Sequence, residues 1–191
     1  DSGLYDAYLF NRGPGSEASI SGMFASLFGS AESHILMLPY LPILNDDMEK
    51  GVRRAVDRGI SVEMLIPVDL RGYAAGGMYH YLPKLIESTG ADVSLTIWGE
   101  DGEILPLMHE KLMIVDSRYV VIGSTNFNFR SMELSHELSL VIDSPEIAGL
   151  LERHVDNDVR PVSFHLSLEE AERLEREEGS FLAYLFMYYG G

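Results

Sequence analysis

The chain has 191 residues, which is enough to bury the core of one domain. Its 30 acidic side chains outnumber its 14 basic ones, and the formal charge of −16 disfavours nucleic acid as a partner. A local basic pocket can still attract an anion, because salt screens charges beyond about 10 Å. The absence of cysteine excludes disulfides, thiolate metal sites and a cysteine nucleophile.

Targeting signals are not evident in the sequence. No apolar run reaches the roughly 20 residues that a membrane-spanning helix needs, and the opening residues lack a charged segment followed by an apolar one. The start at Asp1 rather than Met suggests a mature or excised fragment.

Hydrophobic periodicity predicts strands that alternate with helices, which indicates an α/β layered domain. Asn45 is a candidate N-cap for a helix that ends at Gly59, and Ser144 with Pro145 is typical of a helix start. The expected helices are 16–31, 46–58, 78–88 and one that begins at 145. The expected strands are 34–38, 61–66, 92–98, 111–115, 119–122 and 137–142.

The last part of the chain has a different composition. Ser167 and Glu170 form a possible capping box for a charged helix that ends near Glu178. The apolar, aromatic run 181–189 follows. We expect this tail to pack on the domain or on a partner domain, with a membrane-interface anchor as the alternative.

One short stretch carries the chemical signal. His109, Lys111 and Asp116 form the pattern HxKxxxxD, and Gly123, Ser124 and Asn126 form GSxN. Side chains two residues apart on a strand project to the same face, so the His109 imidazole lies beside the Lys111 ammonium. The pair combines a nucleophile with a phosphate clamp.

The other motif residues favour supporting roles. Asp116 is an odd number of residues from His109 and lies past the strand, so salt bridging or turn stabilisation is more natural for it than direct chemistry. Gly123 allows close backbone approach, while Ser124 and Asn126 can donate hydrogen bonds to phosphate oxygens. A core histidine, a surface lysine or a turn serine would each be unremarkable alone. Their combination indicates a phosphate site.

This constellation resembles the phospholipase D superfamily. Three flanking segments resemble the second half of bacterial cardiolipin synthase-like enzymes: PYLP at 39–42, RRAVDRGISVEMLIP at 53–67 and NFNFRSMELSHE at 126–137. Asn128, Ser135, His136 and Ser139 depart from the usual residues of that branch. The resemblance therefore does not extend to the exact substrate.

The resemblance implies a phospholipase D-like layered domain with a mixed central sheet and helices on both faces. Residues 1–160 would form a catalytic half-domain, and residues 161–191 a C-terminal helix and tail. His109, Lys111 and Asp116 are then the catalytic motif, with Lys111, Ser124 and Asn126 on the phosphate. Gly123 and Glu137 would support them, Glu137 by fixing the tautomer of His109. Tyr40 is a candidate for the pocket mouth, although a Pro-Tyr-x-Pro turn is the simpler interpretation.

The same resemblance implies a reaction through a phosphohistidine, with one histidine as nucleophile and a second as acid. The partner motif would come from the N-terminal half of a longer protein, which we favour, or from a second copy of this chain. His109 would then be the acid more often than the nucleophile. We expect a phospholipid substrate, a bacterial membrane surface, no metal and no cofactor. The alternatives are a nuclease of the same superfamily and a non-catalytic lipid-binding or assembly domain.

Overall fold

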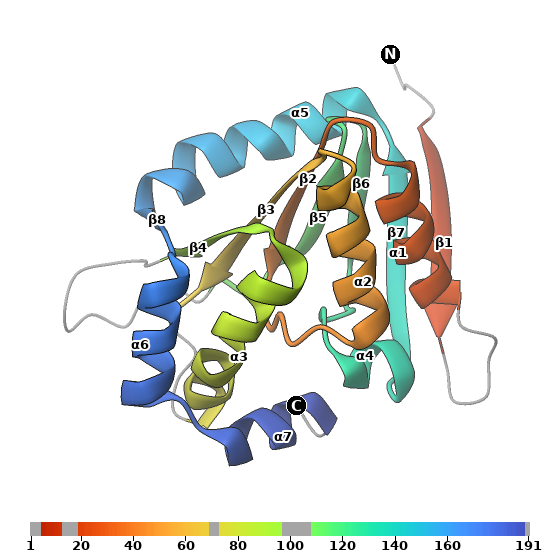
Figure 1. The fold of residues 1–191 in the computed structure, drawn as a ribbon. Helices are drawn as coiled ribbons and strands as arrows, with labels where there is room; N and C mark the ends of the chain where they lie inside the picture. The colour runs from red at the N-terminus through yellow and green to blue at the C-terminus, as the bar shows by residue number, and fades with distance from the viewer. Residues whose placement is uncertain (1–4, 13–18, 69–72, 97–107, 190–191) are drawn as a thin grey trace.

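The structure is a computed structural model that describes residues 5–12, 19–68, 73–96 and 108–189 (Figure 1). Its centre is an eight-stranded sheet with the strand order β1-β7-β6-β5-β2-β3-β4-β8. β2, β3 and β4 are parallel, and the other neighbouring strands are antiparallel. The strands are β1 Asp6–Arg12, β2 His34–Pro39, β3 Ser61–Pro67, β4 Asp92–Thr96, β5 Lys111–Val115, β6 Tyr119–Gly123, β7 Glu137–Asp143 and β8 Ser163–His165.

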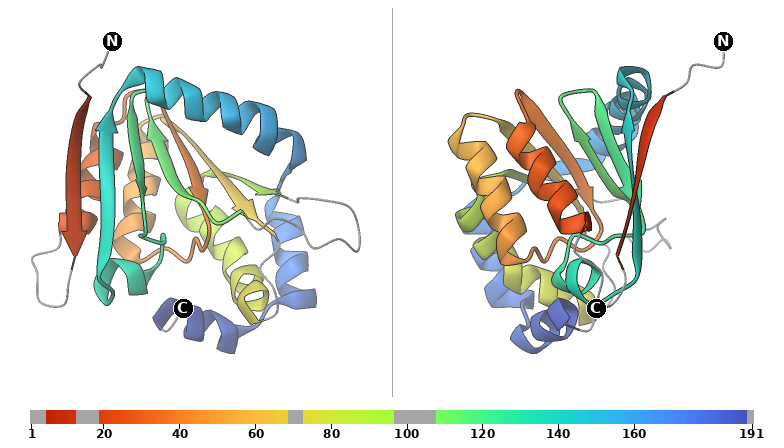
Figure 2. Two further views of the ribbon diagram at one scale, coloured as in Figure 1. Left: turned by 180° about the vertical axis from the view of Figure 1, so that it is seen from behind. Right: turned by 90° about the vertical axis from the view of Figure 1, so that its right-hand side faces the viewer.

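Helices cover both faces of this sheet (Figure 2). The α-helices are α1 Ser19–Ser30, α2 Asp46–Asp57, α3 Tyr73–Thr89, α4 Phe129–Glu133, α5 Pro145–His154, α6 Leu168–Glu178 and α7 Phe181–Tyr189. The π-helical turn η1 Val155–Val159 and the 3-10 turn η2 Arg160–Val162 continue α5. α1, α2 and α3 lie on one face, and α5 with η1 lies on the other. The predicted fold class is therefore confirmed.

β2 shows why the central strands are almost wholly apolar. Ile35 and Met37 belong to the core under α1, α2 and α3, whereas Leu36 and Leu38 belong to the core under α5. A strand buried on both faces needs apolar side chains at every position, so it shows a continuous run instead of alternation.

The helix caps follow the sequence signals. The Asn45 side chain accepts a hydrogen bond from the Met48 N–H, and Ser144 caps α5 through the Ile147 N–H. Ser167 and Glu170 form the reciprocal capping box of α6. The first residues of the helix predicted at 16–31 and the last residues of the strand predicted at 92–98 lie outside the described residues.

Several short elements were not expected from the sequence, namely α4, η2 and β8, and neither were β1 and η1. β1 adds an edge strand antiparallel to β7, and η1 widens the chain into a π-helical turn after α5. Tyr8 and Leu9 of β1 are 55% and 65% exposed. This exposure removes the alternation of buried and polar residues by which a strand is usually recognised.

The apolar tail forms helix α7 and packs on the same domain. Ala183 and Met187 are buried, and Tyr188 stacks on Phe129 of α4 with the ring centroids 4.9 Å apart. The opposite side of α7 leaves Phe181, Leu182, Phe186 and Tyr189 exposed. In the described part of the chain, no helix has the length and apolarity to cross a membrane.

Candidate functional site

Strand directions bring the C-terminal ends of β2 and β6 and the N-terminal ends of β5 and β7 to the same end of the strands, which we call the site edge of the sheet. Pro39 at the end of β2 pairs with Lys111 at the start of β5, and Gly123 at the end of β6 pairs with Ser139 near the start of β7. The antiparallel pairing of β5 with β6 places Lys111 and Gly123 at the same end. Residues that adjoin these strand ends therefore meet at this edge, although they are far apart in the sequence.

His109, Lys111 and Tyr40 form a compact cluster at this edge. The Lys111 Nζ lies 3.2 Å from Nδ1 and 3.1 Å from Nε2 of His109, and it donates to the His109 carbonyl oxygen at 3.1 Å. The Tyr40 ring meets the imidazole edge-on with a centroid separation of 4.1 Å, and Lys111 Nζ lies 4.8 Å from the Tyr40 centroid. The predicted histidine and lysine are thus adjacent, with Tyr40 beside them.

The surroundings of this cluster lower the pKa of both His109 and Lys111. Burial lowers the pKa of His109, and the nearby Lys111 charge lowers it further. Burial also lowers the pKa of Lys111, with the Glu137 carboxylate opposing that shift. A neutral imidazole at neutral pH is the form that can attack phosphorus.

Glu137 is engaged with two hydroxyl groups. The Ser124 hydroxyl donates to Glu137 Oε2 in a short hydrogen bond, and the Ser131 hydroxyl donates to Oε1 at 2.8 Å. Ser124 Oγ also accepts from the Leu138 N–H at 3.1 Å. The carboxylate expected to orient His109 therefore holds Ser124 and Ser131 instead. Ser124 would have to break its bond to Glu137 to donate to a phosphate.

Gly123 and Asn126 flank this network. A Cβ on Gly123 would clash with the Leu138 carbonyl oxygen and lie 2.9 Å from Ser139 Cα, so only glycine allows β6 and β7 to approach this closely. The Asn126 Oδ1 atom is buried and has no hydrogen-bond partner among the described residues. This Oδ1 atom beside buried Phe127 is open to a ligand donor, and a 180° flip of the amide would present its NH₂ group instead.

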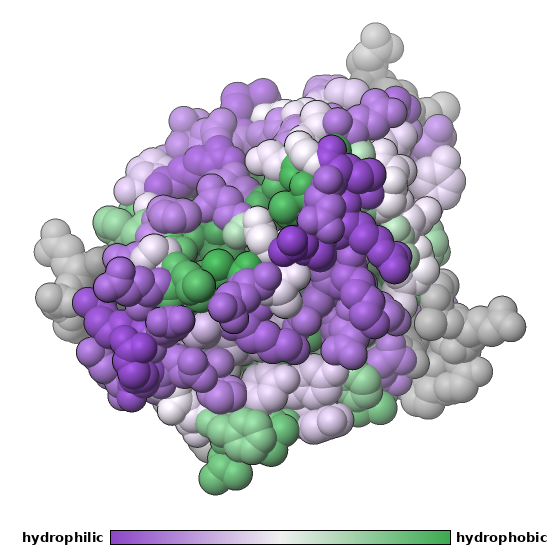
Figure 3. Space-filling model, in the orientation of Figure 1, coloured by the Kyte–Doolittle hydropathy of each residue, from purple (hydrophilic) through white to green (hydrophobic). Residues whose placement is uncertain are grey.

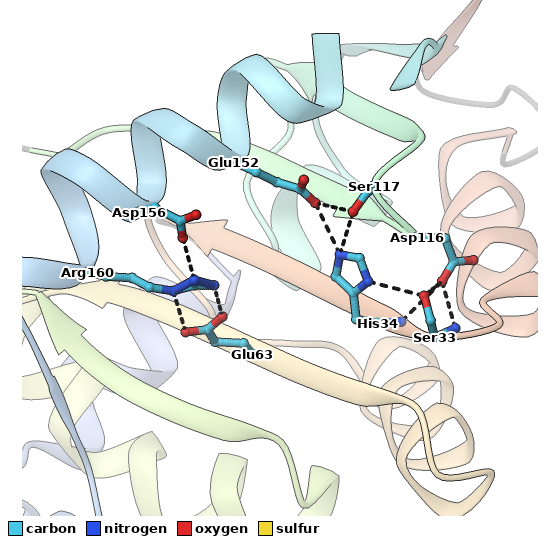
Figure 4. Close-up of polar contacts among 8 residues, drawn as sticks. All are labelled: Ser33, His34, Glu63, Asp116, Ser117, Glu152, Asp156 and Arg160. Carbon is cyan, nitrogen blue, oxygen red and sulfur yellow. Dashed lines mark hydrogen bonds and ion pairs between the residues drawn. The ribbon is translucent and has the colours of Figure 1, made fainter. Parts of the chain in front are cut away.

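Asp116 lies at the opposite end of β5 from Lys111, at roughly 16 Å for five strand residues. Its carboxylate accepts the N–H of Glu32 at 2.9 Å. It also accepts the N–H of Ser33 at 2.8 Å and of His34 at 3.1 Å, and Figure 4 shows these two residues beside Asp116. Its φ of 54° marks a tight turn. The structure does not bring Asp116 to the His109 cluster, and these contacts support a structural role that fixes the entry to β2.

Ser131 is the site residue that the sequence did not indicate. It lies in α4, whose N-cap Asn128 accepts the Ser131 N–H at 2.9 Å. The segment N-x-x-S is a weak capping signal. Contact with Glu137 depends on how α4 folds back on β7, which spacing alone does not reveal.

The fold is similar to that of two solved structures. The first is Nuc, a phospholipase D family member from Salmonella typhimurium. It is 22% identical with a TM-score of 0.66, and the match covers 85% of this chain and 99% of that one. The second is the phosphatidylserine synthase of Haemophilus influenzae, at 17% identity and a TM-score of 0.68, covering 91% and 44%. At these identities the likeness concerns the fold.

A family model described as the phospholipase D-like domain of cardiolipin synthase matches residues 24–159, and the chain belongs to this family. The probable cardiolipin synthase YwiE of Bacillus subtilis is 26% identical over 85% of this chain and 32% of the relative. Cardiolipin synthase A of Serratia proteamaculans is 28% identical over 69% and 26%. The chain thus spans about a third of the length of such relatives.

Proposed function

We propose that this chain supplies one half of a two-histidine site that cleaves or transfers the phosphodiester of a phospholipid through a phosphohistidine. The observation that carries the proposal is the Lys111 ammonium held 3.1 Å from His109 Nε2, at the edge that also bears Ser124 and Asn126. A cation and amide donors beside an imidazole suit the extra negative charge of a pentacoordinate phosphorus.

In the proposed reaction, an imidazole nitrogen of one half forms a bond to phosphorus as the bond to the leaving alcohol breaks. The second half protonates that alcohol. Water or another alcohol then attacks phosphorus, breaks the P–N bond and returns a proton to the second half. Water as acceptor gives hydrolysis, and an alcohol gives phosphatidyl transfer.

His109 suits the nucleophilic role in this scheme. The resemblance to second halves favours the acid role, but burial and Lys111 both lower the pKa of His109 and disfavour the protonated form that an acid needs. We therefore assign the attack to His109 and the proton transfer to the histidine of the missing half.

The second half is proposed to come from a longer polypeptide. The relatives are about three times as long as the part that this chain matches, which leaves room for a second domain. A symmetric dimer of this chain is the other arrangement that would bring two imidazoles together. A phospholipid substrate also places the protein at a bacterial membrane surface while it acts.

Turnover of phosphatidylglycerol and cardiolipin micelles, compared with nicking of supercoiled plasmid, tests the substrate class. The protein should include both halves, supplied as the longer polypeptide or as the dimer if the chain pairs. We expect lipid turnover that is lost in His109→Ala and kept in His165→Ala, whose exposed histidine lies on β8. Plasmid nicking without lipid turnover would support the nuclease alternative, and no turnover of either would favour a non-catalytic domain.

A further inference from the structure

A groove of about 380 Å³ runs between α1 and α2, on the face of the sheet that α1, α2 and α3 cover. Gly22, Ala25 and Gly29 line the α1 side, and Lys50 and Arg54 line the α2 side. Figure 3 shows a strongly hydrophilic band over α2. The small α1 residues leave the groove open beside two cations.

Polar groups in this groove lack partners. Among the residues that the structure describes, the Arg54 guanidinium has no hydrogen bond or ion pair, and the buried Ser21 Oγ has no hydrogen-bond partner. Within the described residues, Lys50 has one ion pair, with Asp47 at 3.9 Å, and both side chains are exposed. Exposed pairs of this kind interact weakly, so the local charge is largely uncompensated.

The groove has fixed walls. Arg58 Nη2 donates to the Phe28 carbonyl oxygen at 2.8 Å and to the Ala31 carbonyl oxygen at 3.3 Å, which ties the end of α2 to the end of α1. A Cβ on Gly51 would lie 2.7 Å from the Phe28 ring, so the two helices are in close contact below the groove. A rigid groove loses little entropy when it binds a ligand.

The neighbouring hollow between α2 and α3 shares Lys50 and Arg54 with the groove, and its other two cations are paired. Lys84 lies 2.9 Å from Glu49, and Arg53 Nε donates to Asp57 at 2.9 Å. Arg54 therefore borders both hollows, and the Ser21 hydroxyl lies in the hollow on the α1 side.

An apolar pocket of about 330 Å³ continues from the groove on the other side of α1. Tyr8, Met23, Leu27 and Val141 are among its lining residues, and Gly22 lines both hollows. A Cβ on Gly22 would have no atom within 4 Å, so no side chain separates the groove from the pocket at this position of α1. An amphiphile could cross it with its charged end by Arg54 and its apolar end by Tyr8.

We propose that the groove between α1 and α2, together with the apolar Tyr8 pocket, is a second anion site. It binds the phosphate head group of a phospholipid and the first part of its acyl chain. It shares no residue with the His109 cluster and depends on no catalytic step. Lys50, Arg54 and Ser21 hold the phosphate, and the Tyr8 pocket holds the chain. The site would keep a lipid on the domain independently of turnover.

Titration of the ¹⁵N-labelled chain, followed by the amide signals of Gly22 and Gly51, tests this site. The probe is monomeric dihexanoylphosphatidylglycerol, with chainless glycerophosphoglycerol and zwitterionic dihexanoylphosphatidylcholine as comparisons. We expect saturable shifts at both glycines, with glycerophosphoglycerol bound more weakly and phosphatidylcholine weakest. His109→Ala should leave the shifts unchanged, which separates this site from the proposed catalytic one.

Variants assign the two ends of the ligand. Arg54→Gln should weaken binding of both phosphatidylglycerol and glycerophosphoglycerol about tenfold, because a charge-assisted hydrogen bond is lost. Arg153→Gln, which removes an exposed guanidinium from α5 on the other face, should have no effect. Tyr8→Ser should weaken only the lipid with chains. Absent shifts, or shifts that survive Arg54→Gln, would overturn the site, and equal affinity for the chainless probe would overturn its assignment to a lipid.

Discussion

The Lys111 ammonium lies within 3.2 Å of both ring nitrogens of His109, so a fixed positive charge sits beside the imidazole. Burial and this charge both lower the pKa of His109. We predict that Lys111→Met raises the pKa of His109 without restoring the ordinary value of about 6.5, because burial is the larger cause and remains. An NMR titration of the ring signals measures this shift, with Lys84→Met as the control.

The same pKa determines a pH dependence. Because the folded chain binds this proton less readily than the unfolded chain, the contribution of His109 destabilises the fold as pH falls below about 6.5. Lys111→Met should reduce that loss. A His109 pKa that stays the same or falls in Lys111→Met would contradict the proposed electrostatic coupling.

Gly123 is predicted to be required for the approach of β6 to β7. Gly123→Ala places a methyl group against the Leu138 carbonyl oxygen and Ser139 Cα, and we expect it to cost about 2–3 kcal/mol of unfolding free energy. Gly29→Ala is the matched control, because its Cβ meets no atom within 4 Å. That change should be neutral or stabilise α1 by up to about 1 kcal/mol. Urea denaturation of both variants distinguishes backbone contact from a general effect of added methyl groups.

Asp116 should affect stability and leave the chemistry of His109 intact. Burial raises the pKa of Asp116, but the hydrogen bonds from Glu32, Ser33 and His34 together outweigh it, and the net pKa is lowered. Asp116→Ala should therefore cost about 2 kcal/mol at neutral pH. The difference from the original chain should shrink as pH falls through the lowered pKa, since protonation removes the same interactions. Loss of the His109 reaction in a folded Asp116→Ala chain would contradict this structural role.

The two sides of α7 should respond differently to truncation. Met187 is 3% exposed and Phe186 is 59% exposed. Met187→Ala should cost about 2–4 kcal/mol of unfolding free energy, whereas Phe186→Ala should cost under about 1 kcal/mol. Equal, small effects in thermal or urea unfolding would mean that α7 does not pack on the domain in solution.

Local signals explain which elements could be predicted. Asn45, Ser144 and the pair Ser167 and Glu170 each act within a few residues, so the caps of α2, α5 and α6 were predictable. β1 depends on its pairing with β7, more than a hundred residues away, and its exposed side chains carry no alternating pattern. α7 is apolar on nearly all sides, so periodicity could not identify it as a helix.

The site was predictable to a similar extent. The spacing predicts that His109 lies beside Lys111 and apart from Asp116, and the structure has these neighbours, although His109 lies just before β5 instead of on it. The partners of Glu137 could not be predicted, because they depend on where α4 places Ser131 after the chain turns back to β7. The free Oδ1 of Asn126 is likewise a property of packing and is not visible in the motif.

Covalent capture with an activated substrate tests the central claim most directly, because a nitrophenolate leaves without a proton from the proposed second half. We predict that methyl p-nitrophenyl phosphate releases a burst of nitrophenol and adds one methyl phosphoryl group to His109, seen by intact and peptide mass spectrometry. His165→Ala should keep the adduct and His109→Ala should lose it. No adduct on the folded chain, or an adduct that persists in His109→Ala, would contradict the assignment of His109 as the nucleophile of a phosphodiester half-site.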